Sequence, residues 1–158
     1  MVMQMNEVYE MLERLNINYK KIEHKPVYTV EEAQKIKSNI YGIGCKNLFL
    51  KSKSHKYYLY VLREDKKADL KSLSEILQCG RLSFASEDEL FECLKLKRGS
   101  VTPLGILNDD SKVTVILDKE LKGEKILVHP NVNTATVSLG YEDLLKVIRH
   151  CNNEYMEI

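Results

Sequence analysis

The sequence has no hydrophobic run long enough to cross a membrane, because no apolar stretch approaches the roughly 18 residues that such a helix needs. Its start, MVMQMNEVYEMLERL, has neither the basic residues nor the small-residue cleavage site of a secretory signal peptide. These two absences predict a cytoplasmic protein without a membrane partner.

Signatures of metal and nucleophile chemistry are also missing. The four cysteines, Cys45, Cys79, Cys93 and Cys151, form no C-x-x-C pair, and no H-x-x-x-H spacing occurs. We therefore expect reduced, buried cysteines, no metal site and no cofactor. The G-x-S-x-G elbow of esterases and the G-x-x-x-x-G-K-[ST] loop of nucleotide-binding proteins are absent as well.

No charge of one sign dominates the chain. The 24 lysines and arginines nearly balance the 23 aspartates and glutamates, for a net charge of +1. This balance excludes a protein that attracts polyanions with its whole surface. Any contact with nucleic acid must use a local patch.

The hydrophobic pattern predicts an α+β fold. Period-3.6 segments alternate irregularly with short strand-like runs, which favours a mixed β-sheet covered by helices, and the length suits a single domain over residues 1–158. Capping residues Thr29 and Ser86 mark two helix starts, and Gly80 is expected at the left-handed position that ends a third helix. We expect helices in 4–15, 30–37, 68–79, 87–96 and 140–151, and strands in 17–24, 46–51, 57–63, 81–86, 112–121, 124–130 and 133–139.

Three segments place polar or conformationally special residues beside predicted core strands, and such conflicts often mark functional sites. In the first, Lys46 and Asn47 directly precede the apolar run Leu48–Leu50. Lys46 could keep its ammonium in water with its stem on apolar surface, or present it to an oxyanion, phosphate or carbonyl in a cleft. Asn47 could contact a ligand or only close a local turn.

The other two segments are loops rich in special residues. Gly99, Ser100, Val101, Thr102 and Pro103 could form a nest of backbone N–H groups for a ligand, or a plain surface turn. His129 ends a predicted strand and precedes Pro130. A lone histidine is more often structural than catalytic, and the same caution applies to His24.

Six stretches, taken in order, resemble the freestanding branch of the YbaK/prolyl-tRNA editing family. They are EHKPVYTVEEA, KNLFLKSKSHKYYLYVL, LSFASEDEL, RGSVTPLGILND, VTVILDKEL and HPNVNTATVSL. The resemblance spans about residues 18–150 and implies the family's fold, with a mixed and partly barrel-like sheet. It also implies a trans-acting hydrolase that clears mischarged tRNA(Pro), with Ala-tRNA(Pro) as the expected substrate.

The resemblance gives roles to the special residues. Lys46 and Asn47 are expected to hold the terminal adenosine and aminoacyl ester for attack by water. The 99–103 loop supplies donors, and His129 with Pro130 lines the amino-acid pocket. The alternatives are a Cys-tRNA(Pro) deacylase and a non-catalytic tRNA- or amino-acid-binding module linked to proline metabolism. Editing is needed because a synthetase pocket built for proline cannot strongly exclude a smaller amino acid. Each missing methylene gives only ~1–3 kcal/mol of discrimination.

Partners follow from the same resemblance. They are aminoacylated tRNA(Pro) and, as a further candidate, prolyl-tRNA synthetase, with the protein itself a monomer or weak dimer. The expected phosphate contacts are basic residues of two segments, although a merely solvated face is an equal alternative. These residues are Lys51, Lys53, Lys56, Lys95, Lys97 and Arg98.

Overall fold

The computed structural model describes residues 5–110 and 112–158, which form five α-helices, two 3-10 helices and eight strands within those ranges. The helices are α1 (Met5–Arg14), α2 (Val30–Lys37), α3 (Leu70–Leu77), α4 (Glu87–Leu94) and α5 (Tyr141–His150), with 3-10 helices η1 (Pro103–Asn108) and η2 (Lys119–Leu121). The strands are β1 (Lys20–Glu23), β2 (Ile43–Ser52), β3 (Tyr57–Arg63), β4 (Leu82–Phe84), β5 (Val113–Leu117), β6 (Lys125–Val128), β7 (Ala135–Gly140) and β8 (Tyr155–Glu157). No helix in these ranges is long and apolar enough to span a membrane.

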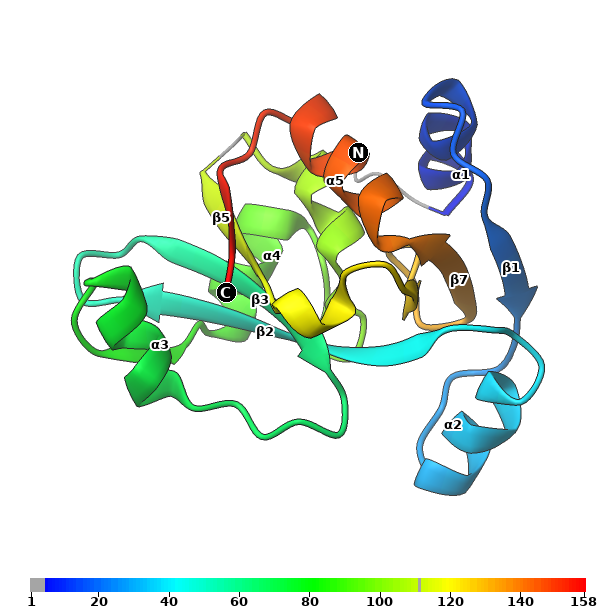
Figure 1. The fold of residues 1–158 in the computed structure, drawn as a ribbon, viewed down its shortest axis with the longest axis horizontal. Coiled ribbons are helices and arrows are strands. Elements are labelled where there is room, and N and C mark those ends of the chain that lie inside the picture. The colour runs from blue at the N-terminus through cyan, green and yellow to red at the C-terminus, as the bar shows by residue number, and fades with distance from the viewer. Residues whose placement is uncertain (1–4, 111) are drawn as a thin grey trace.

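The strands form one mixed sheet in the order β1-β7-β6-β2-β3-β5-β8, with β4 added beside β2 (Figure 1). The β2–β3 hairpin and the β6–β7 pair are antiparallel, whereas β2–β6, β3–β5 and β5–β8 are parallel. The predicted α+β fold with a mixed sheet is therefore confirmed. Within residues 5–110 and 112–158 the sheet does not close into a barrel, because β1 and β8 end the order without pairing to each other.

Side-chain alternation along the strands builds a core on each face of the sheet. Phe49, Leu59 and Val115 join the larger core with residues of α1, α4 and α5. Leu50, Tyr58 and Ile116 point the other way and pack with Leu73 of α3 and its neighbours. The central strands are thus buried on both sides, which explains their nearly continuous apolar sequences.

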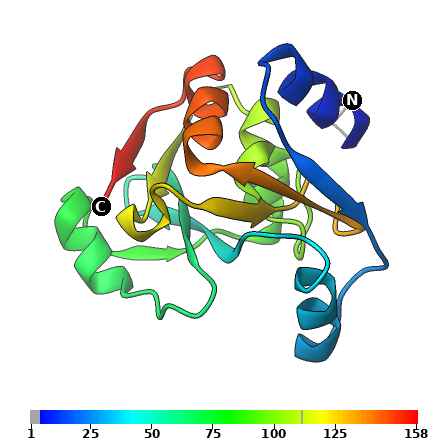
Figure 2. The ribbon, with the colours of Figure 1, turned by 45° about the vertical axis from the view of Figure 1, so that its right-hand side comes forward.

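Helix α2 differs from the other helices because none of its residues is fully buried. It lies at the β1 end of the molecule, whereas α3 lies at the opposite end (Figures 1 and 2). Its N-terminus is capped as predicted, since the Thr29 hydroxyl accepts a hydrogen bond from the Glu32 amide at 3.1 Å. Helix α2 is therefore an outlying element at this end of the sheet rather than part of the core.

Two local predictions need correction. Helix α3 ends at Gln78, which takes the left-handed conformation with φ of 52°, so Gly80 lies beyond the helix end. Gln78 can adopt the left-handed conformation because the free-energy cost of one such residue is small compared with the stabilisation from the core contacts of α3. Strand β8 was not predicted, because three residues give no readable alternation; it forms by pairing with β5.

Candidate functional site

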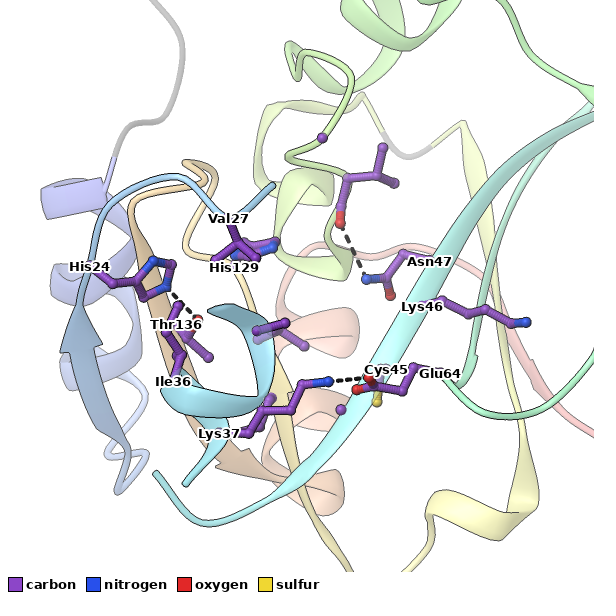
Figure 3. A pocket seen from close by; sticks show the side chains of 16 residues that line it. His24, Val27, Ile36, Lys37, Cys45, Lys46, Asn47, Glu64, His129 and Thr136 are labelled. Atoms are coloured by element: carbon purple, nitrogen blue, oxygen red, sulfur yellow. Dashed lines mark hydrogen bonds and ion pairs between the residues drawn. The ribbon is translucent and has the colours of Figure 1, made fainter. Parts of the chain in front are cut away.

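A cavity of about 400 Å³ lies where α2 covers the sheet, between β2, β6, β7 and the 99–101 loop (Figure 3). Of the nine predicted catalytic and substrate-binding residues, five line this cavity: Lys46, Asn47, Gly99, Val101 and His129. Residues from all three special segments of the sequence therefore meet in one place.

The register of three strands explains this convergence. Gly44 of β2 is the partner of Leu127 in β6, and Leu127 is the partner of Ser138 in β7. Paired residues point to the same face, and so do residues two apart along a strand. Leu127, His129 and Thr136 therefore share the face that α2 covers.

Asn47 connects the strand wall of the cavity to the 99–101 loop. Its Nδ2 donates a hydrogen bond to the Val101 carbonyl at 3.2 Å. Its Oδ1 is buried and has no hydrogen-bond partner within the described chain. An unpaired buried acceptor is costly, so this oxygen is suited to receive a donor from a ligand.

His129 is held as a neutral imidazole. Its Nδ1 lies 3.0 Å from the Ala135 carbonyl, which can only accept, so Nδ1 carries the proton and Nε2 keeps a lone pair. Burial lowers the pKa of His129 below its usual value, more than the carbonyl hydrogen bond raises it. His129 thus offers an acceptor, not a positive charge, to the cavity.

His24 is a cavity residue that sequence reasoning did not select. Its Nε2 is 2.8 Å from the Thr136 hydroxyl, and its Nδ1 is 2.8 Å from the Lys25 carbonyl. In the neutral ring Nδ1 then donates and Nε2 accepts from Thr136. The only signal in the sequence was its place before KPVYT, which by itself did not separate a ligand residue from a structural one.

Four predicted substrate-binding residues do not line the cavity. These are Ser100, Thr102, Pro103 and Pro130, and all four are buried. Thr102 donates its hydroxyl proton to the His129 carbonyl at 2.7 Å and also caps η1. Thr102 therefore ties the loop to the histidine strand, which is a supporting position rather than one facing a ligand.

The Lys46 ammonium has no ion-pair partner among the described residues. Its stem lines the cavity, while its side chain extends away from His24 and His129 (Figure 3). A lysine side chain has four rotatable bonds and a compact charge. The ammonium therefore points out of the cavity in this conformation, and rotation about these bonds would bring it to an anionic group held there.

Cys45 also lines the cavity but is a poor nucleophile. Burial raises the pKa of its thiol to about 12, and the nearby Glu64 carboxylate adds to the rise. All four cysteines are thiols rather than disulfides, and they are half-buried, whereas full burial was expected. Within the described residues, no cluster of three or more His, Cys, Asp or Glu side chains could hold a metal ion.

An ion pair closes one side of the cavity. Lys37 at the end of α2 pairs with Glu64, which follows β3. Gly44 leaves room for this pair, because a Cβ there would overlap the Glu64 carboxylate. Sequence reasoning missed the pair, since its partners are 27 positions apart.

The six basic residues predicted to contact tRNA do not line the cavity. Lys53 and Lys56 lie at the far end of the β2–β3 hairpin, about 20 Å from Lys46 at the usual rise of a strand. Lys51 is paired with Glu89 at 3.1 Å and Arg98 with Glu87 at 3.1 Å. Lys95 and Lys97 are exposed. Their contact with tRNA stays a prediction.

Comparison with known proteins shows the family of the chain. The profile of the aminoacyl-tRNA editing domain matches residues 24–147. The prolyl-tRNA editing protein ProX of Acetoanaerobium sticklandii is 47% identical over 150 residues, which cover 93% of this chain and 92% of that protein. The prolyl-tRNA synthetase associated domain-containing protein 1 of Danio rerio is 40% identical, over 90% of this chain and 79% of that one.

A crystal structure described as a candidate trans-editing enzyme for prolyl-tRNA synthetase shares the fold. It superimposes with a TM-score of 0.74 at 19% identity, over 97% of this chain and 94% of the other. The profile match and the high identity to ProX each cover most of the sequence. The chain therefore belongs to the aminoacyl-tRNA editing domain family.

Proposed function

We propose that this protein is a trans-editing hydrolase that removes the amino acid from mischarged tRNA(Pro), with the alanyl ester as its substrate. The observation that carries the proposal is the cavity in which Lys46, Asn47, Gly99, Val101 and His129 meet. The similarity to a prolyl-tRNA editing protein supports the choice of tRNA(Pro).

The chemistry needs no protein nucleophile. An aminoacyl ester is already activated, so a positioned water and donors for the developing oxyanion are enough. The raised pKa of the Cys45 thiol, about 12, argues against attack by that side chain. In this scheme water adds to the ester carbonyl, and the tetrahedral intermediate collapses to the free amino acid and the tRNA hydroxyl.

Three groups are suited to stabilise the oxyanion. Lys46 brings a cation that has no carboxylate partner within the described chain. The Ser100 amide is already bonded to the Lys97 carbonyl at 3.0 Å, whereas the amides of Gly99 and Val101 have no such partner among the described residues. Those two amides are the loop donors that we assign to the ester.

The acceptors of the cavity suit the donor groups of the substrate. Asn47 Oδ1 and His129 Nε2 each have a free lone pair, whereas an aminoacyl-adenosine carries ribose hydroxyls and an amino group. We assign these two atoms to orienting the substrate, with His129 and Val101 limiting the space for its side chain. A pocket that admits alanine and is too small for proline would discriminate by size.

The test is deacylation of a panel of esters: Ala-, Cys-, Ser- and Pro-tRNA(Pro), with Ala-tRNA(Ala). We expect the highest kcat/KM on Ala-tRNA(Pro) and little hydrolysis of Pro-tRNA(Pro). Preference for the cysteinyl ester would make the protein a cysteinyl deacylase. Binding of these tRNAs without hydrolysis of any of them would identify a non-catalytic module and overturn the proposal.

A further inference from the structure

A second concavity, here called the basic hollow, adjoins the cavity and has a different composition. It measures about 720 Å³, and its described lining residues include Lys20, Lys21 and Lys125 with a single carboxylate, Glu13. Tyr41 also lines it and is 72% exposed. Three ammonium groups beside an exposed aromatic ring are the combination that binds single-stranded nucleic acid.

The basic hollow continues the sheet face of the cavity. Ser138 lines the hollow and lies two residues beyond Thr136 of the cavity, and Lys125 lies two residues before Leu127. Lys20 is the β1 partner of Ser138. Residues two apart on a strand share a face at about 7 Å. The hollow therefore begins roughly one side-chain length from the cavity.

The segment between α2 and β2 contributes Tyr41 to the hollow and leads into Gly44 of the cavity. The Tyr41 carbonyl accepts a hydrogen bond from the Ser138 hydroxyl. Gly42, with φ of 154°, passes so close to the sheet that a Cβ would come within 2.7 Å of the Leu127 side chain. This close approach holds Tyr41 over the hollow while leaving its ring in solvent.

The lysines of the hollow are available for a ligand. No ion pair engages Lys20, Lys21 or Lys125 within residues 5–110 and 112–158. Lys21 lies over the Tyr9 ring at 4.2 Å, which leaves Lys20 and Lys125 as the freest cations. On the β3 side of the cavity, by contrast, the basic residues are already engaged in ion pairs. Lys37 pairs with Glu64, and Arg63 pairs with Asp65.

From this arrangement we infer that the basic hollow binds the single-stranded 3′ end of the tRNA next to the terminal nucleotide. Lys20 and Lys125 contact its phosphates, and a base stacks on Tyr41. The inference rests on the proposed function, because the terminal adenosine must occupy the cavity for the next nucleotides to reach the hollow. The basic hollow provides the local cationic patch that a chain with a net charge of only +1 needs to bind RNA.

The test measures affinity for uncharged tRNA(Pro) by fluorescence anisotropy between 50 and 200 mM salt. Each lost phosphate contact lowers the slope of log Kd against log salt by about one. The double variant Lys20→Ala, Lys125→Ala should lower that slope by about two and raise Kd at least ~10-fold at low salt. Tyr41→Ala should raise Kd at least ~5-fold with the slope unchanged, as expected for a stacking contact.

The matched control is Lys67→Ala, Lys71→Ala, which removes the same charge from exposed positions at the α3 end (Figure 1). Its slope should equal that of the unmodified protein. An unchanged slope in the Lys20, Lys125 variant, or an equal fall in both double variants, would overturn the inference.

A second measurement separates this inference from the proposed function. Hydrolysis of 3′-alanyl-adenosine, which is too short to reach the hollow, should proceed equally in the unmodified protein and in the Lys20, Lys125 variant. Absence of hydrolysis in both would refute the proposed function, while the anisotropy slopes would still decide whether the hollow binds RNA.

Discussion

Lys46 is the residue on which most of the proposed chemistry depends. Lys46→Ala should lower kcat/KM for Ala-tRNA(Pro) by at least ~100-fold, the scale of losing one oxyanion-stabilising group. The melting temperature should hardly change, because the half-buried Lys46 has no ion pair within the described chain. Lys67→Ala, a loop lysine outside the cavity, is the control. Near-normal turnover of Lys46→Ala would exclude this lysine from the mechanism.

His129 predicts a pH dependence of stability. Because its folded-state pKa lies below the ordinary value of 6.5, the unfolded chain takes up this proton first as the pH falls. The contribution of neutral His129 to the free energy of unfolding is therefore intact above about pH 6.5 and is lost progressively below it. Urea unfolding at pH 7.5 and 5.5 should show this loss, and His129→Gln should reduce it. An equal loss in the variant would assign the effect to other groups.

At the scale of elements, the 99–103 loop should set selectivity. Val101 lines the cavity and its carbonyl is held by Asn47. Val101→Ala enlarges the pocket by one or two methylene-sized volumes, so hydrolysis of seryl and cysteinyl esters should gain over alanyl by ~1–3 kcal/mol in transition-state energy. The measurement is kcat/KM for each ester on the same tRNA(Pro). Unchanged ratios would mean that Val101 is not a wall of the amino-acid pocket.

The contact between α2 and β3 gives a second prediction at this scale. Gly44→Ala should displace the Glu64 carboxylate and break its pair with Lys37. Both partners are more than 30% exposed, so the cost in unfolding free energy should stay within about 1 kcal/mol. Because α2 has no fully buried residue, its amides should nevertheless exchange hydrogen faster and KM should rise.

Glu64→Gln is the matched variant, since it weakens the same pair without adding a Cβ. It should reproduce the faster exchange in α2. If α2 exchanges at the same rate in Glu64→Gln as in the unmodified protein, the ion pair does not hold the helix.

For the whole molecule, the distribution of ligating groups predicts insensitivity to chelators. Across the described residues no three His, Cys, Asp or Glu side chains cluster, and burial raises the pKa of the Cys45 and Cys151 thiols to about 12 and 11. Deacylation should therefore survive EDTA and brief thiol alkylation. Strong inhibition by EDTA, reversed by added metal, would contradict this prediction.

The sequence alone determined the fold class, most elements and the three segments whose residues line the cavity. Strong periodicity and capping residues such as Thr29 and Ser86 are local properties, so they can be read without coordinates. Lys46, Gly99 and His129 were recognisable because each breaks a local rule beside a core strand, and because their order resembles one family.

Only the tertiary structure decided which residues meet. The register of β1, β7, β6 and β2 places His24 and Thr136 beside His129, and the Lys37–Glu64 pair joins α2 to the end of β3. The same register joins Lys20 and Lys125 in the basic hollow, although 105 positions separate them in the sequence. Such contacts depend on long-range strand pairing, which no local pattern specifies, because register follows from the packing of both sheet faces.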